Sequence, residues 1–157
     1  MDESIVRGGR VAPGAGEARW VGGECLTFKV RGVDSQGAVA IVESTVQPGY
    51  APPLHIHLHE SEAFYILEGE FVFTIGDQEI PAPAGSLISV PRGRLHRFRN
   101  AGSAPGKMLI VFWPAVAFED FVAEVGTPQQ LTEPPDVARL AAAATRHGIV
   151  VPPQEGL

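Results

Sequence analysis

The chain has 157 residues, of which 45% are hydrophobic and 19% charged, and its formal net charge is −6 at pH 7. This length and hydrophobic content predict one domain with an ordinary core. The charge offers no basic surface for nucleic acid, and no apolar stretch approaches the length of a transmembrane helix, so neither a nucleic-acid nor a membrane partner is expected. The N-terminus has no apolar run of the kind found in secretory signals, which makes a cytoplasmic location the expectation.

The first two thirds of the chain predict strands. Residues 1–24 are rich in Gly, Ala and Arg and are expected to form an N-terminal arm with at most one short strand. Strands are predicted at 26–30 and 38–46, and the last strand, 108–113, ends at Pro114. Many glycines and prolines fit short strands joined by turns. A barrel is therefore placed at residues 25–114.

The hydrophobic period changes to a helical one in residues 115–157, which are expected to form a helical extension and tail. The first predicted helix has apolar residues at helical spacing and stops at Gly126. Its apolar residues are Phe118, Phe121, Val122 and Val125. A second helix is expected to begin near Pro134-Pro135 and to end near Gly148. Its expected apolar stripe is Val137, Leu140, Ala141 and Ala144.

Two short blocks within the predicted barrel carry most of the histidines. The first reads G-x5-H-x-H-x4-E-x6-G and comprises Gly49, His55, His57, Glu62 and Gly69. The second reads G-x5-P-x-G-x2-H-x3-N and comprises Gly85, Pro91, Gly93, His96 and Asn100. Three of the five histidines of the chain occupy the defined positions of these blocks.

The spacing within the blocks has structural consequences. Alternate side chains of a strand share a face, so His55 and His57 are expected to project together. Glu62 lies an odd number of positions after His57 and could not share this face on an unbroken strand. A bend at 58–61 is therefore required. A hairpin at 68–70 is expected to lead into the next strand, 71–75. A turn at 91–93 then places His96 on a strand from which it can meet the other three residues.

Three imidazoles and one carboxylate suit a divalent first-row metal. We expect one ion per chain, which could be iron, manganese, nickel, copper, cobalt or zinc. With four protein ligands, an octahedral ion keeps two positions for water, oxygen or substrate.

Both blocks resemble the two signature motifs of the cupin superfamily without departures, and the chain is similar to the small cupins related to quercetin dioxygenase. The resemblance implies an all-β, double-stranded β-helix, a jelly-roll barrel, here with one or two C-terminal helices. It also implies that His55, His57, Glu62 and His96 are metal ligands and that Asn100 is structural. A homodimer is expected by the same resemblance.

Aromatic residues at alternate strand positions relative to Glu62 and His96 suggest a pocket beside this site. Phe64 and Ile66 share the parity of Glu62, and Phe98 lies two positions after His96, so all are expected to face inward. We interpret Phe64 and Phe98 as substrate-binding residues, with simple core filling as the alternative. His59, near the bend, is assigned to the rim or to solvent.

The resemblance favours a dioxygenase-type oxidoreductase acting on a small enolic or phenolic molecule. In that hypothesis Glu62 is both a ligand and the catalytic group that accepts the substrate proton. The alternatives are a cupin that binds a metal or small molecule without turnover, and a non-redox isomerase, decarboxylase or cyclase.

Overall fold

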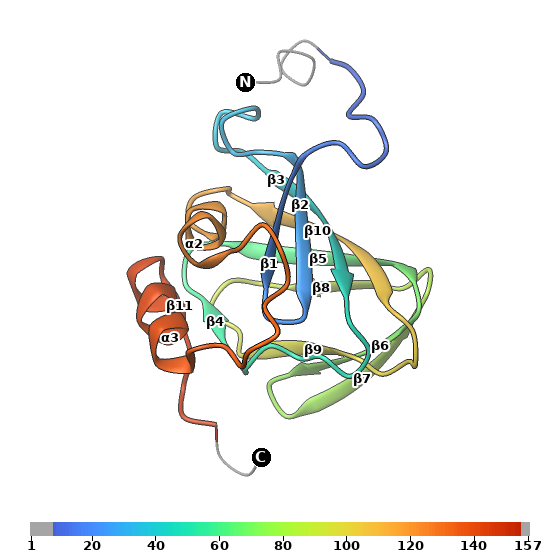
Figure 1. Cartoon of the computed structure of the whole chain (residues 1–157), viewed down its shortest axis with the longest axis vertical. Coiled ribbons are helices and arrows are strands. Elements are labelled where there is room, and N and C mark those ends of the chain that lie inside the picture. Colours follow the sequence, from blue (N-terminus) through green and yellow to red (C-terminus); the bar gives the residue numbers. More distant parts are fainter. Residues whose placement is uncertain (1–7, 155–157) are drawn as a thin grey trace.

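The structure is a computed structural model that describes residues 8–154 (Figure 1). The first seven residues of the predicted arm and residues 155–157 of the predicted extension lie outside the described residues. The described chain forms a six-stranded sheet with the order β1-β2-β3-β10-β5-β8 and a three-stranded sheet with the order β7-β6-β9. Neighbouring strands are antiparallel throughout both sheets.

The larger sheet consists of β1 (Glu17–Val21), β2 (Glu24–Val30), β3 (Ala40–Val46), β10 (Gly106–Trp113), β5 (Ser61–Glu68) and β8 (Leu87–Val90). The smaller sheet consists of β7 (Gln78–Pro83), β6 (Glu70–Ile75) and β9 (His96–Asn100). Two short strands, β4 (Ile56–His57) and β11 (Ile149–Val150), pair with each other. Strand β1 lies within the predicted arm, and β2 begins at the last residue of that arm.

The core lies between the two sheets because alternate side chains of each strand point inward. Strand β3 buries Ala40, Val42, Ser44 and Val46 and leaves the residues between them partly exposed. Phe64 of β5 packs against Phe73 of β6 and Phe98 of β9, with ring centroids 5.0 and 6.1 Å away. Such edge-to-face and tilted pairs stabilise aromatic cores. The predicted all-β jelly roll with C-terminal helices is confirmed.

The prediction of a hairpin at residues 68–70 is wrong. Strand β5 pairs with β10 and β8, whereas β6 pairs with β7 and β9, so the chain passes from one sheet to the other at Gly69. Strand β5 is already paired along both edges, by β10 on one side and β8 on the other. It therefore has no free edge with which β6 could pair. Gly69 has a φ of 90°, and a Cβ atom there would lie 3.1 Å from the Cα of Gly106 on β10. A side chain is therefore disfavoured where the chain changes sheets.

Two helices, α2 (Phe118–Val125) and α3 (Val137–Arg146), lie on one side of the sheets in the described part of the chain (Figure 1). Asp136 caps α3 by accepting a hydrogen bond from Arg139 N at 3.0 Å. The apolar stripe of α3 differs from the prediction, because Ala143 and Ala144 are buried while Val137 is 64% exposed. Neither helix is long and apolar enough to cross a membrane.

The segment that follows α3 is tied to β4. Strand β11 places Ile149 opposite His57, and Leu58 N donates to Gly148 O at 2.9 Å. The Gln154 side chain accepts a hydrogen bond from Leu54 N at 2.9 Å and donates one to Leu54 O at 3.3 Å. These contacts hold residues 148–154 against the strand that carries His57.

Asn100, at the end of β9, is fully buried and uses its whole amide group. Its Nδ2 donates to Val46 O and Ala104 O, each at 2.9 Å, and its Oδ1 accepts from Gly102 N at 2.9 Å. These bonds join β9 to β3 and hold the loop after residue 100, which agrees with the structural role implied for Asn100.

We predict that Asn100→Ala lowers the free energy of unfolding by about 2–4 kcal/mol, because it leaves buried backbone groups without partners. Arg99→Ala, the exposed neighbour on the same strand, serves as the control and is expected to stay within about 0.5 kcal/mol of the parent chain. Urea denaturation measures both values. Equal stability of the two variants would contradict the role of Asn100.

Candidate metal centre

Main-chain hydrogen bonds bring the two sequence blocks together. His55 N donates to His96 O and His96 N donates to His55 O, both at 3.0 Å. Gly93 N, in the turn before β9, donates to His57 O at 2.8 Å. The chain bends after His57 and returns as β5, which carries Glu62 on its inward face. The expected bend and the expected strand for His96 are both present.

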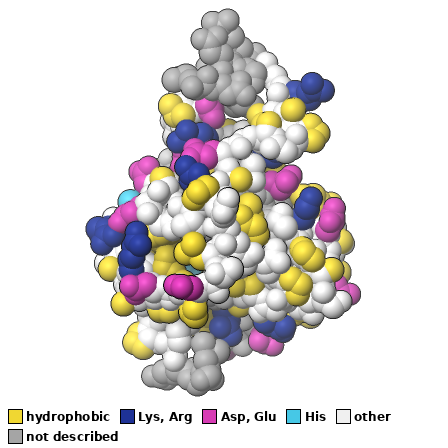
Figure 2. Space-filling view, in the orientation of Figure 1, with side chains coloured by type: hydrophobic (Ala, Val, Ile, Leu, Met, Phe, Trp, Pro, Cys, Tyr) yellow, Lys and Arg dark blue, Asp and Glu magenta, His cyan; other side chains and the backbone are white. Residues whose placement is uncertain are grey.

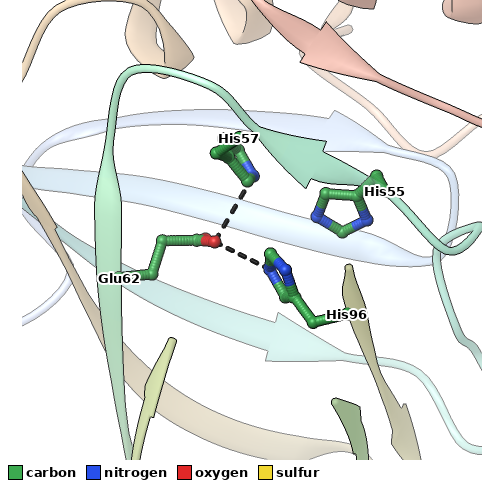
Figure 3. Close-up of side chains that lie close together, drawn as sticks. All are labelled: His55, His57, Glu62 and His96. Atoms are coloured by element: carbon green, nitrogen blue, oxygen red, sulfur yellow. Dashed lines mark ion pairs between the residues drawn. The ribbon is translucent and has the colours of Figure 1, made fainter. Parts of the chain in front are cut away.

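The four residues predicted as metal ligands lie together and point toward one another (Figure 3). Each offers one ligand atom, and these atoms all lie within 4.8 Å of one another. Glu62 Oε2 is 3.4 Å from His57 Nε2 and 2.8 Å from His96 Nε2. The His55 and His96 ring centroids are 4.5 Å apart. Three separate segments thus supply one compact group of nitrogen and oxygen donors.

Backbone carbonyls fix the orientation of two of the imidazoles. His55 Nδ1 lies 2.7 Å from Pro53 O, and His96 Nδ1 lies 2.9 Å from Arg94 O. A carbonyl oxygen only accepts, so Nδ1 carries the proton in both rings and Nε2 keeps its lone pair. Metal-bound histidines are usually held in this way.

The burial of the cluster fits a bound cation. His57, Glu62 and His96 are each less than 5% exposed. Among the described residues, Glu62 Oε2 and His96 Nε2 are buried atoms without a partner in hydrogen-bond geometry. Buried polar atoms without partners are costly, and a divalent ion between them would satisfy both.

The pKa values of the ligands also suit metal binding. Burial, with a contribution from His96, lowers the pKa of His55 to about 3. Burial and the two other imidazoles lower the pKa of His57 well below its ordinary value. Burial raises the pKa of Glu62. Burial alone would lower the pKa of His96, but its contact with the Glu62 carboxylate raises it instead. His55 and His57 are therefore neutral donors at pH 7.

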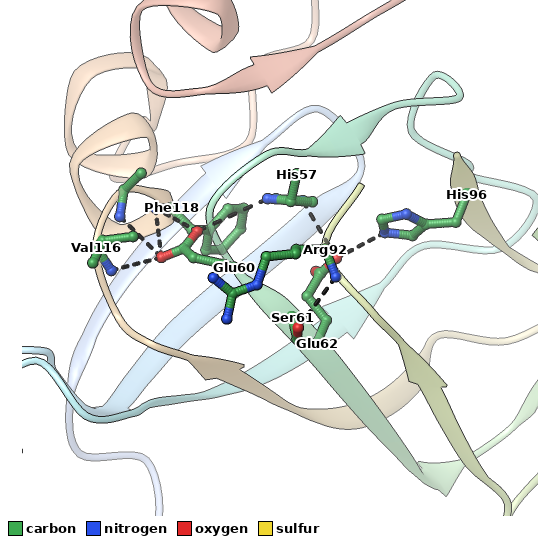
Figure 4. A network of polar contacts seen from close by, with 9 residues as sticks. His57, Glu60, Ser61, Glu62, Arg92, His96, Val116 and Phe118 are labelled. Atoms are coloured by element: carbon green, nitrogen blue, oxygen red, sulfur yellow. Dashed lines mark hydrogen bonds and ion pairs between the residues drawn. The ribbon is translucent and has the colours of Figure 1, made fainter. Parts of the chain in front are cut away.

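Glu60 is a buried carboxylate next to His57 whose role was not predicted from the sequence. Its Oε1 accepts hydrogen bonds from Val116 N at 2.8 Å and Ala117 N at 2.9 Å, and its Oε2 accepts one from Phe118 N at 3.1 Å (Figure 4). The carboxylate is thus held by the free N–H groups at the start of α2. Its Oε2 lies 3.9 Å from His57 Nδ1. No short-range pattern reveals these contacts, because the partners are more than fifty positions away.

Glu24 is a second carboxyl group beside the cluster that was missed. It is 7% exposed, and Ser44 Oγ donates to its Oε1 at 2.6 Å. Burial raises the pKa of Glu24 to about 7, against the hydrogen bond from Ser44 and with a contribution from Glu62. The sequence could have predicted this position, because Glu24 alternates along the strand with Leu26 and Phe28, which face inward.

A cavity of about 70 Å³ adjoins the four ligands. Glu24, Phe64, Phe98, Phe112 and Phe118 contribute to its walls. The two predicted substrate-binding residues, Phe64 and Phe98, therefore lie beside the cluster, and both also belong to the hydrophobic core. The space accommodates an ion and a few water-sized molecules. His59 is exposed and lies outside the cluster.

Comparison with known proteins identifies relatives of this chain. Residues 42–112 match the cupin domain family. The chain is 31% identical over 97 residues to quercetin 2,3-dioxygenase of Bacillus subtilis, which covers 62% of this chain and 28% of that protein. It is 36% identical over 64 residues to the oxalate-binding protein of Thermotoga maritima, which covers 41% of this chain and 53% of that protein. The chain thus spans about half of one relative and about a quarter of the other.

Solved structures share the fold. A structure described as a predicted oxalate decarboxylase from Thermotoga maritima has a TM-score of 0.61 and 21% sequence identity. The match covers 66% of this chain and 96% of that chain. Identity at this level concerns the fold alone.

We predict that His96→Ala abolishes stoichiometric metal binding, because it removes one of four converging ligand atoms. His59→Ala replaces an exposed histidine that follows β4 and is expected to keep full metal content. Elemental analysis of full-length protein, purified without chelators or a metal-affinity column, measures both. Full occupancy in the His96→Ala variant would overturn the ligand assignment.

We also predict that Glu24→Gln stabilises the metal-free chain relative to the parent at alkaline pH. The pKa of Glu24 in the fold is about 7, above its ordinary 4.5. Its favourable contribution is therefore complete below about pH 4.5 and is lost as the pH rises through 7. The stability of the variant minus that of the parent should rise by on the order of 3 kcal/mol between pH 5 and pH 9.

Urea denaturation at the two pH values measures this difference, which cancels the titration of groups common to both chains. Glu43→Gln, on the partly exposed face of β3, controls for the loss of a charge. A difference for Glu24→Gln that does not change with pH would refute the assignment.

Proposed function

Because this chain belongs to the cupin superfamily, we propose that it is a metal-dependent dioxygenase acting on a small enolic or phenolic molecule. The observation that carries the proposal is the convergence of three histidines and one glutamate on one buried point. The similarity to quercetin 2,3-dioxygenase supports the reaction class.

The residues of the site divide the work between them. His55, His57 and His96 would hold an ion through their ring nitrogens, and a divalent redox-capable ion would supply Lewis acidity and electron transfer with dioxygen. Glu62 is both a ligand and an acceptor for the proton of the substrate hydroxyl at Oε2.

Aromatic side chains keep bulk water away from the reacting oxygen. Phe112 and Phe118 stack with ring centroids 4.2 Å apart, and both rings lie within 6 Å of the His57 ring. Exclusion of water strengthens the electrostatic interactions within the site and protects reactive species from side reactions. Phe64 and Phe98 add further apolar wall to the same cavity.

A binding protein without turnover is the second candidate. The similarity to an oxalate-binding protein favours it. In this case the same four residues hold an ion that binds a ligand oxygen, and no dioxygen is consumed. The expected homodimer is compatible with both candidates and stays a prediction.

Oxygen consumption separates the two candidates. The full chain is reconstituted separately with iron, manganese, nickel, cobalt, copper or zinc and mixed with flavonols and simple enols in air. We expect oxygen uptake that matches substrate loss with at least one redox-active metal, and none with zinc or with the His96→Ala variant. Ligand binding without oxygen uptake for every metal would overturn the dioxygenase proposal in favour of the binding protein.

A further inference from the structure

A second and larger cavity lies next to the metal centre. Its volume is about 360 Å³, within the range of small-molecule sites. Its walls are mainly apolar and include Leu26, Phe118, Phe121, Leu140, Ala144 and Ile149. Figure 2 shows hydrophobic side chains gathered on this face of the molecule beside helix α3, with acidic and basic side chains at their margin. We call this space the apolar cavity.

The walls of the apolar cavity come largely from outside the matched cupin domain. Leu26 lies on β2, Phe118 and Phe121 on α2, and Leu140 on α3. All of these precede or follow residues 42–112. The segments that this chain adds to the domain therefore shape the space beside the metal centre.

Glu24 stands where the two cavities meet. Four residues line both spaces, namely Glu24, Pro52, His55 and Phe118. Of the two charged residues of the apolar cavity, Glu24 and Arg97, only Glu24 also lines the metal pocket. A ligand that extends from the apolar cavity toward the metal ligands therefore meets Glu24 together with Pro52, His55 and Phe118.

The carboxyl group of Glu24 has an oxygen to offer a ligand. Ser44 occupies Oε1, and Oε2 has no hydrogen bond among the described residues. The Gln154 amide and His55 Nδ1, which also line this cavity, are already engaged, the first with Leu54 and Pro152 and the second with Pro53. Burial of a carboxyl group among apolar walls is unfavourable unless it finds a further polar partner.

We propose that the apolar cavity binds the body of an uncharged small molecule and that Glu24 forms a hydrogen bond with one of its hydroxyl or carbonyl oxygens. This inference rests on the proposed function for its substrate class, but it concerns a binding step that needs no metal chemistry. Apolar walls disfavour a charged body, and the size of the cavity suits a molecule of one or two rings. Because the pKa of Glu24 is about 7, the group can donate to a carbonyl or accept from a hydroxyl near neutral pH.

The test uses 4-nitrophenol, an uncharged phenol at pH 6, titrated calorimetrically into the full chain. Glu24→Leu is expected to weaken binding about tenfold through loss of the hydrogen bond. Glu24→Gln keeps a polar group of the same shape and should restore most of the affinity. Ala141→Phe, which fills the apolar cavity from α3, should abolish binding. Glu43→Gln is the matched control and should bind as the parent does.

The outcomes separate this inference from the proposed function. Unchanged affinity in both Glu24→Leu and Ala141→Phe overturns the inference, even if the metal-loaded parent consumes oxygen. The expected affinity series without oxygen uptake supports the inference and overturns the dioxygenase proposal. Circular dichroism of each variant identifies loss of fold. If Ala141→Phe is unfolded, the Leu and Gln variants of Glu24 decide, since equal affinities in these two overturn the inference.

Discussion

The candidate metal centre depends on one reciprocal main-chain interaction, the pair of hydrogen bonds between His55 and His96. Each block of the sequence supplies an incomplete set of donors: two histidines and a glutamate in one, a single histidine in the other. The backbone bridge fixes the distance between the blocks without using either imidazole. Both rings are then free to bond to local carbonyls through Nδ1 and to present Nε2. The side-chain chemistry is thus arranged by the main chain.

The three carboxyl groups in and around the site, those of Glu62, Glu60 and Glu24, have different stabilising partners. Glu62 lies among the histidines, while Glu60, two positions earlier, accepts hydrogen bonds from the N–H groups of residues 116–118 at the start of α2. Because Glu60 lies in the bend and Glu62 directly follows it, the same turn of chain serves the candidate metal ligands and the helix. Glu24 has a different support, since its partner is the hydroxyl of Ser44 on the neighbouring strand. Each carboxylate near the site has its own source of stabilisation.

The sequence predicted the features that depend on local spacing. The parity of His55, His57 and Glu62 required a bend, and the turn before His96 required a new strand; both are present. The failures concern contacts between distant segments. Nothing in residues 62–75 distinguishes a hairpin from a passage between sheets, because that depends on β10 and β8 occupying the edges of β5. The pairing of β11 with β4 and the contacts of Glu60 are likewise absent from any short pattern.

The two hydrogen bonds between the Gln154 side chain and the Leu54 backbone join residues 100 positions apart. During synthesis, β4 and its histidine leave the ribosome long before the segment that pairs with them. The strand that carries His57 thus has one free edge until residues 148–154 have emerged, and the apolar cavity lacks one wall for the same period. The apolar cavity is therefore complete only after residues 148–154, which contribute Ile149, Val151 and Gln154 to its lining, have docked against β4.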